Sequence, residues 1–229
     1  MMNSISQMHL NMLGKVVSSL TPELREQIVF VGGCTTCLFV DEASQEDIRS
    51  TEDVDLIISV LSHREYISFQ NELKQCGFKE LGLEDEEGPI CRMKLGETVI
   101  DLMPTEASVL GFQNKWYPKA FESAEDYRLN EDVIKLIHPV YFLATKFEAY
   151  NNRGKGDILE SKDIEDIFIV VNGRSQLYGE VYNFKYENQS VVKFIQEQFR
   201  LLRQHYNYLY KIDGYKKAEE RIQKILDLP

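Results

Sequence analysis

Apolar side chains in the first part of the chain are spaced as in a helix that is followed by a short buried strand. In residues 5–20 they recur every three or four positions, which is the period of one helix face (Ile5, Met8, Met12, Leu13, Val16, Val17, Leu20). The run Ile28–Val31 is apolar and rich in β-branched residues, and Gly32-Gly33 ends it as a strand. We expect a helix over 35–40 to open from this glycine turn, and an acidic loop over 41–52.

The following residues predict a sheet. Residues 54–61 have the β-branched content of a strand, and residues 63–76 have a helical pattern that Gly77 closes. A meander of three short strands is expected over 78–103, with turns at 84–88 and at Gly96. Strands that alternate with helices in this order are typical of a mixed sheet with helices packed beside it.

After Pro104 the pattern becomes helical. Residues 110–130 are aromatic and irregular, and the elements expected beyond them are a strand at 133–137, a helix over 139–169 broken around 151–157, and a helix over 190–226 interrupted near 213–214. The predicted fold class is therefore α+β, a mixed sheet with flanking helices followed by a helical C-terminal part. We place the core in residues 1–104 and the mainly helical part in residues 105–229.

Composition is ordinary for a soluble globular protein, with 43% hydrophobic and 28% charged residues in 229. No apolar run approaches the ~18–20 residues of a membrane span, and the first residues lack the basic and apolar regions of a signal peptide. We therefore expect a cytoplasmic protein with no membrane partner. Cys34 and Cys37 have the C-x-x-C spacing of zinc or redox sites, but no second pair completes such a site, which favours packing under the glycine turn.

The net charge of −11 argues against a protein coated by nucleic acid, yet the charge is uneven. Residues 193–229 carry +3 and the first 192 residues carry −14. Tyrosines are interleaved with the basic residues of this tail (Tyr206, Tyr208, Tyr210, Tyr215 among Arg200, Arg203, Lys211, Lys216, Lys217). Such a mixture can stack on and neutralise RNA, or it can belong to a helix that buries its aromatic side chains.

Three acids interrupt apolar strand patterns. Asp53 and Asp55 lead into the strand at 54–61, and Asp101 lies between Ile100 and Leu102. Residues two apart on a strand share a face, so on neighbouring strands the three carboxylates would converge. Converging carboxylates repel each other unless a hard cation lies among them, and Mg²⁺ shared with nucleotide phosphates is the usual one. The alternative is that these acids are strand ends that face water.

Two further groups of residues suit phosphate binding. Glycines at 32 and 33 allow the backbone to approach a phosphate closely. Lys146 and Arg153 are seven residues apart and share one helix face, which we expect to face a cleft, while Asp163 and Asp166 lie one turn apart on the next helix. The helix face could bind a triphosphate, or it could be an exposed face held by salt bridges.

Together these motifs resemble the AbiEii-like nucleotidyltransferases, a branch of the DNA polymerase β-like superfamily. The resemblance covers about residues 31–174 and rests on a glycine turn, Arg49-x-Thr51-x-Asp53-x-Asp55, Lys146, Arg153 and Lys162-Asp163-x-x-Asp166. Gly33 stands where the family often has serine, and the insert 154–162 is rich in glycine. The resemblance implies a nucleotidyltransferase-fold sheet, with the C-terminal part completing the nucleotide and acceptor cleft.

The activity implied is transfer of NMP from an NTP to an acceptor hydroxyl with Mg²⁺ or Mn²⁺. Asp53 and Asp55 would hold the metal ion that bridges the triphosphate, and Asp101 would hold a second metal ion and help to deprotonate the acceptor. Lys146 and Asp163 would complete the catalytic set, although Asp166 could replace Asp163 in this role. The residues expected to bind the nucleotide are Gly32, Gly33, Thr35, Arg49, Thr51, Lys146 and Arg153.

The acceptor is the most open part of this prediction. Many relatives are toxins of toxin–antitoxin pairs, and similar enzymes add nucleotides to tRNA ends, so a tRNA end bound along residues 193–224 and a cognate antitoxin are the implied partners. The alternatives are a small-molecule (antibiotic) or protein adenylyltransferase and a non-catalytic nucleotide-binding module.

Overall fold

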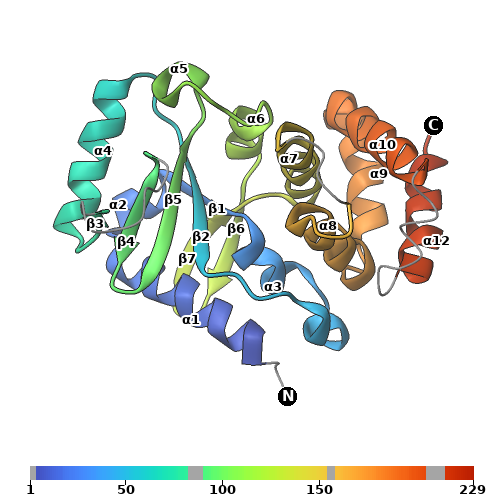
Figure 1. Cartoon of the computed structure of the whole chain (residues 1–229), viewed down its shortest axis with the longest axis horizontal. Helices are drawn as coiled ribbons and strands as arrows, with labels where there is room; N and C mark the ends of the chain where they lie inside the picture. Colours follow the sequence, from blue (N-terminus) through green and yellow to red (C-terminus); the bar gives the residue numbers. More distant parts are fainter. Residues whose placement is uncertain (1–3, 82–89, 154–157, 205–214) are drawn as a thin grey trace. The chain divides into compact units, whose positions relative to one another are not determined.

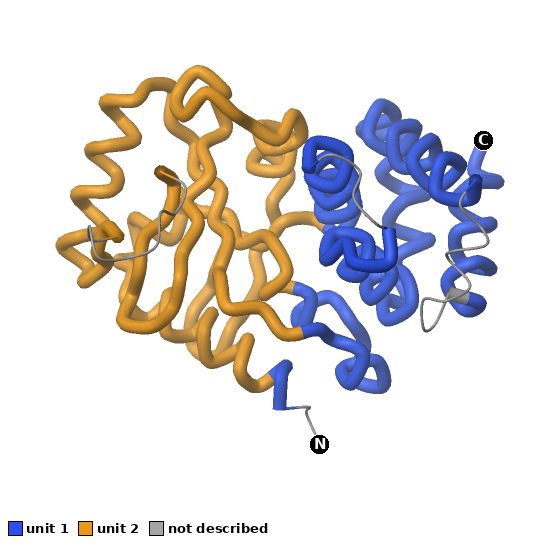
Figure 2. Tube along the Cα trace, viewed as in Figure 1, with its two compact units in different colours: residues 1–6, 36–49, 139–229 blue, residues 7–35, 50–138 orange. Residues whose placement is uncertain are grey.

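The structure is a computed structural model that describes residues 4–81, 90–153, 158–204 and 215–229 (Figure 1). By its internal contacts the chain divides into two compact units (Figure 2). The sheet unit comprises residues 7–35 and 50–138, and the helical unit comprises residues 1–6, 36–49 and 139–229. Each unit is therefore built from separate stretches of the chain.

The sheet unit contains a seven-stranded mixed sheet of order β3-β4-β5-β2-β1-β7-β6. Its parallel pairs are β2 with β5 and β1 with β7, and its other neighbours are antiparallel. The strands are β1 (Ile28–Val31), β2 (Asp53–Ile58), β3 (Lys79–Glu80), β4 (Arg92–Leu95), β5 (Thr98–Pro104), β6 (Glu125–Leu129) and β7 (Asp132–Leu136). The fold class predicted from the sequence is confirmed.

Helices flank this sheet, and one face of its central strands β2 and β5 is fully buried. The helices and short turns that belong wholly or mainly to the sheet unit are α1 (Ser4–Ser19), α2 (Pro22–Arg25), η1 (Gly33–Thr35), α4 (His63–Gln75), α5 (Ala107–Leu110) and α6 (Tyr117–Glu122). Val54 and Leu56 on β2, with Ile100 and Leu102 on β5, are inaccessible to solvent. The acids alternate with these residues and so lie on the opposite face of the two strands.

The helical unit packs its helices around α8, whose residues are buried from Ile167 to Gly173. Phe147 and Phe199 meet edge to face, with ring centroids 5.1 Å apart, and join α7 to α10. The elements of this unit are α3 (Thr36–Phe39), η2 (Glu42–Asp47), α7 (Pro139–Asn152), α8 (Lys162–Gly173), α9 (Leu177–Glu187), α10 (Gln189–Arg203) and α12 (Tyr215–Leu226).

The two units differ from the division expected at residues 104 and 105. Residues 105–138 lie in the sheet unit because β7, predicted as a strand at 133–137, pairs in parallel with β1. Strand β6 in turn pairs with β7 in antiparallel orientation. Residues 36–49 lie in the helical unit, where α8 contacts α3 and η2. The sequence also did not predict β6 or α9.

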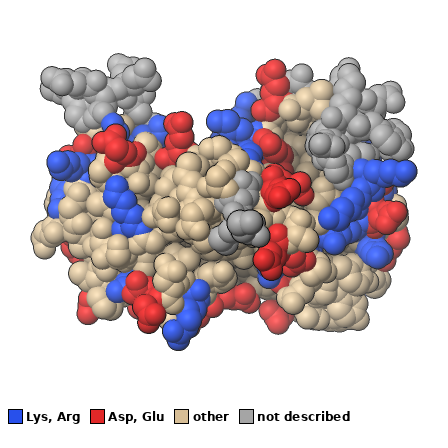
Figure 3. Space-filling model, turned by 90° about the horizontal axis from the view of Figure 1, so that it is seen from below, with Lys and Arg blue, Asp and Glu red and all other residues tan. Residues whose placement is uncertain are grey.

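Basic side chains gather toward the C-terminal helices. Arg200, Lys216 and Lys217 are exposed, and Figure 3 shows Lys and Arg side chains at the right-hand end of its view, where Figure 1 places α12. Arg221 has a different environment, because its guanidinium donates to the carbonyls of Val171 and neighbouring residues at the end of α8. The predicted tyrosines at 206, 208 and 210, with Lys211, lie outside the described residues. No described helix has the length and apolar character needed to cross a membrane.

Candidate active site

The glycine turn holds an aspartate against the backbone. β1 ends at Val31, which lies opposite Asp55 in the register of β1 and β2. Gly32 has a φ of +77°, and a Cβ built there would lie 1.8 Å from Oδ2 of Asp55, so only glycine fits between strand and carboxylate. The turn is closed by Thr35, whose buried hydroxyl donates to the Gly32 carbonyl at 2.8 Å. Thr35 therefore has a structural partner, and its predicted contact with a nucleotide stays a prediction.

Strand pairing brings the three predicted acids to one face. Asp55 pairs with Asp101 in the parallel register of β2 and β5, and Asp53 lies two residues before Asp55. The hydroxyl of Thr51 donates to Asp53 in a short hydrogen bond, and the Thr51 amide donates to Nε2 of the buried His9 at 3.3 Å. His9 thus positions the entry to β2. Nothing in the spacing of this single histidine pointed to that contact.

Asp101 is already paired with a cation. Nε and Nη2 of Arg92 on β4 donate to its two carboxylate oxygens, each at 2.8 Å. Arg92 lies directly opposite Asp101 in the antiparallel register of β4 and β5. Each carboxylate oxygen of Asp101 therefore accepts one hydrogen bond from the guanidinium of Arg92.

The donor set fits a divalent cation only in part. Asp53 and Asp55 offer carboxylate oxygens, the ligands that Mg²⁺ and Mn²⁺ prefer, and the Asp55 carboxylate lies against Gly32 where a side chain at that position would be. Within the described ranges, however, no three His, Cys, Asp or Glu side chains lie together closely enough to hold a metal ion. Asp53 and Asp55 fit such an ion, whereas Asp101 faces Arg92.

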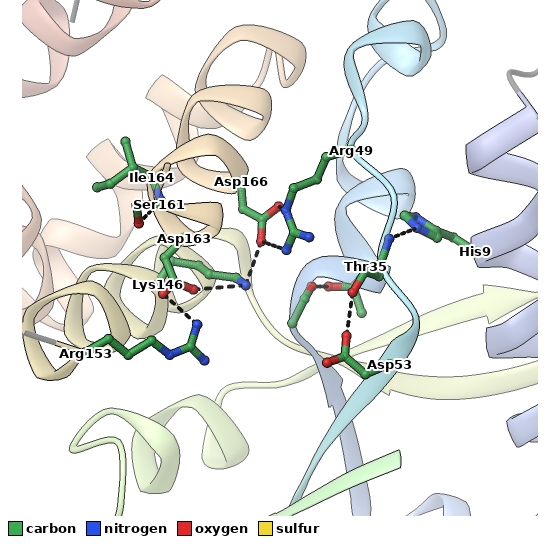
Figure 4. Close-up of polar contacts among 12 residues, drawn as sticks. His9, Thr35, Arg49, Asp53, Lys146, Arg153, Ser161, Asp163, Ile164 and Asp166 are labelled. Carbon is green, nitrogen blue, oxygen red and sulfur yellow. Dashed lines mark hydrogen bonds and ion pairs between the residues drawn. The ribbon is translucent and has the colours of Figure 1, made fainter. Parts of the chain in front are cut away.

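The helical unit contains a buried ion cluster centred on Asp166 (Figure 4). Arg49 donates to its two oxygens from Nε and Nη2 at 2.7 and 2.8 Å, and the Lys146 ammonium lies 2.7 Å from Oδ2. Lys146 also lies 3.5 Å from Asp163, which pairs with Arg153 at 3.0 Å. Burial by itself raises the pKa of the Asp166 carboxyl, but the charges and hydrogen bonds of Lys146 and Arg49 outweigh it, so that this pKa lies below its ordinary value.

This cluster bears on two expectations from the sequence. Arg49, expected at the nucleotide, makes a bidentate pair with Asp166, and its nucleotide contact stays a prediction. Lys146 was expected to face a cleft, yet its side chain is only 11% exposed and lies between two carboxylates. Arg153 differs, since 72% of its side chain is exposed. Of the two acids, Asp166 is the fully buried partner, and Asp163 joins the lysine to the exposed arginine.

The two basic residues of this cluster should therefore respond differently to removal. Lys146→Ala should lower the unfolding free energy by about 1–3 kcal/mol, because a buried carboxylate loses one of its donors. Arg153→Ala removes the same charge from an exposed position and should change it by less than about 0.5 kcal/mol. Urea unfolding followed by circular dichroism measures both. Equal losses in the two variants would show that burial of Lys146 does not govern its contribution.

Cys34 and Cys37, which have the C-x-x-C spacing, are buried thiols. All four cysteines lie in the described part of the chain as thiols. Burial raises the pKa of the Cys37 thiol to about 12, which disfavours the thiolate needed for metal or redox chemistry.

Comparison with solved structures gives distant matches. No protein-family model matches the sequence, and no curated protein matches it. An antigenic nucleotidyltransferase-like protein from Paracoccidioides brasiliensis is 21% identical, with a TM-score of 0.46 over 81% of this chain and 93% of its own. The antibiotic-resistance factor ANT(2'')-Ia is 12% identical, with a TM-score of 0.47 over 88% and 98%. JHP933 from Helicobacter pylori is 13% identical, with a TM-score of 0.43 over 99% and 94%.

Proposed function

We propose that this chain is a divalent-metal-dependent nucleotidyltransferase that moves NMP from an NTP to an acceptor hydroxyl. The observation that carries the proposal is the pair Asp53 and Asp55 at the start of β2, with Asp55 held against the positive-φ turn at Gly32. Two carboxylates at the edge of a buried strand are costly unless a cation neutralises them. Glycine at position 32 lets the backbone of the turn lie directly against the Asp55 carboxylate, and contact of Gly32 and Gly33 with phosphates stays a prediction.

In the proposed reaction the acceptor hydroxyl passes its proton to a water molecule as its oxygen bonds to the α-phosphorus of the NTP. The bond from that phosphorus to the bridging oxygen breaks, and pyrophosphate leaves. A bound divalent cation would supply charge neutralisation for the phosphates. Asp53 and Asp55 would hold that cation, and Thr51 keeps Asp53 oriented. Neutralisation of the triphosphate by Lys146 and Arg153 stays a prediction from the sequence.

The direct test incubates the full chain with each α-³²P-labelled NTP, Mg²⁺ or Mn²⁺ and total RNA. We expect one NTP to label an acceptor, and Asp53→Asn or Asp55→Asn to lower labelling by at least about 10³-fold, since catalysis here depends on positioning and charge. Asp126→Asn is the matched control, because this exposed acid of β6 pairs with Lys135 in the same unit. Loss of labelling in the control as well, or none lost in the two site variants, would refute the proposed site.

As the acceptor we propose RNA, most specifically a tRNA end, bound along the basic residues of α10 and α12. This rests on the +3 charge of residues 193–229 in a chain that is otherwise strongly acidic. Changing Arg200, Arg203, Lys216 and Lys217 to Glu should abolish RNA labelling and leave the metal-dependent thermal shift with NTP intact. Arg221 is left unchanged because it supports the end of α8. Label on a small molecule or on protein would instead identify an adenylyltransferase, and NTP binding without any transfer would identify a binding module.

The toxin-like role belongs to the same proposal and depends on the same residues. Induced expression should arrest growth when the chain is active, and Asp55→Asn should relieve the arrest at equal protein level. A cognate antitoxin would be the protein that restores growth without changing that level. Growth arrest by the Asp55→Asn protein would separate toxicity from nucleotidyl transfer.

A further inference from the structure

The side chain of Asp101 has a fixed environment within the sheet unit. It projects from the middle of β5 on the same face as Asp55, and its side chain is 13% exposed. Each of its two oxygens accepts one N–H of the Arg92 guanidinium at 2.8 Å. An arginine fork matches both oxygens of a carboxylate at once, so this pairing is the most complete that a single side chain can make.

Arg92 is held in place by the sheet as well as by its partner. The hairpin of β4 and β5 pairs Leu95 with Thr98 and therefore places Arg92 across from Asp101. The hydrogen bonds that Arg92 donates to Asp101 raise the pKa of Arg92, and the charges of Asp101 and Asp53 act in the same direction. The guanidinium therefore keeps its positive charge, and this charge also interacts with Asp53, the first acid of β2.

We propose that Arg92 stands in for a second divalent cation at the third carboxylate, so that the site binds one ion through Asp53 and Asp55 only. This inference rests on the metal-binding part of the proposed function. Asp101 then acts as a positioning residue for Arg92, whose remaining N–H groups can contact an anionic ligand. A dication next to Asp101 would share oxygens that already accept hydrogen bonds from the guanidinium, and the like charge of Arg92 would repel it.

The proposal is tested by titrating the full chain with Mn²⁺ alone and following the electron paramagnetic resonance signal of unbound Mn²⁺. We expect one Mn²⁺ per chain for the wild type, and Asp101→Asn should change its Kd by less than about 2-fold. Asp53→Asn and Asp55→Asn should each weaken binding by at least about 10-fold. An effect of Asp101→Asn as large as that of Asp55→Asn would overturn the proposal while leaving the metal site in place.

Removing the guanidinium of Arg92 should strengthen Mn²⁺ binding. Arg92→Gln leaves three carboxylates on one face without their cation, and we expect Mn²⁺ binding that is at least about 10-fold tighter or a second ion per chain. Adding Asp101→Asn to Arg92→Gln should cancel that gain, and Arg92→Lys, which keeps the charge, should bind like the wild type. Arg128→Gln is the matched control, because it removes the same charge from an exposed position on β6.

The outcomes separate the two proposals. Equal Mn²⁺ binding by Arg92→Gln, Arg128→Gln and the wild type would overturn the role of Arg92. Absence of Mn²⁺ binding by the wild type, or binding that Asp53→Asn and Asp55→Asn do not weaken, would overturn the metal-dependent function itself and the inference with it.

Discussion

Replacing Asp166 with alanine should lower the unfolding free energy by about 3–5 kcal/mol, the range seen when one partner of a buried ion pair is removed. Asp166 is wholly inaccessible to solvent, and it accepts from Arg49 and Lys146, whose side chains are 12% and 11% exposed. Without the carboxylate, two nearly buried cations lose their shared partner. Urea unfolding measures the loss.

The same residue should make stability depend on pH. The pKa of Asp166 is lowered in the folded state, so the carboxylate stabilises the fold fully above the ordinary aspartate pKa of about 3.9, and this contribution is lost as the pH falls through the lower folded value. Stability of the wild type should therefore fall more steeply than that of Asp166→Asn between about pH 5 and pH 3.

Asp227→Ala provides the control for both measurements. Asp227 is exposed in the same unit, and its carboxylate accepts from the side chain of Gln223 one turn before it. Its removal should change the unfolding free energy by less than about 0.5 kcal/mol. A loss below about 1 kcal/mol in Asp166→Ala would mean that Arg49 and Lys146 find water or other partners at little cost, and that the cluster does not stabilise the helical unit.

The placement of the strand acids could be predicted because it depends only on local rules. Alternation along a strand puts Asp53 and Asp55 on one face, and burial of the neighbouring apolar residues fixes which face that is. The same rules could have predicted the pairing of Arg92 with Asp101. The two-residue turn of Gly96 and Glu97 sets the hairpin register, and counting back from it leads to Arg92.

Other features depend on contacts that the sequence pattern does not show. Arg49 and Asp166 are separated by 117 residues, so nothing local distinguishes a buried partner of Asp166 from a nucleotide ligand. Strand β6 escaped prediction because only Leu129 among its five residues is buried, which leaves no apolar alternation. Helix α9 buries Leu177, Val181 and Phe184 and leaves tyrosines exposed between them, which weakens its helical pattern.

Gly32→Ala should reduce both stability and function, because it changes the contact between the turn and Asp55. A residue other than glycine at a φ of +77° costs about 1–3 kcal/mol. The new Cβ would also lie 1.8 Å from Oδ2, 2.6 Å from Cγ and 2.8 Å from Cβ of Asp55. Rotation of the side chain can relieve the first contact, but the last requires β2 itself to shift, which adds about 1–3 kcal/mol.

Gly111→Ala separates these two effects. Gly111 has a φ of +79°, and a Cβ built there has no neighbour within 4 Å, so this variant has the backbone cost without the collision. We expect Gly32→Ala to unfold at lower urea than Gly111→Ala, to bind Mn²⁺ at least about 10-fold more weakly, and to transfer nucleotide about 10²-fold more slowly, since a shift of about 1 Å at a reacting centre has that effect. Equal behaviour of the two variants would show that Asp55 does not depend on Gly32 for its position, and the glycine turn would then lose its place in the active site.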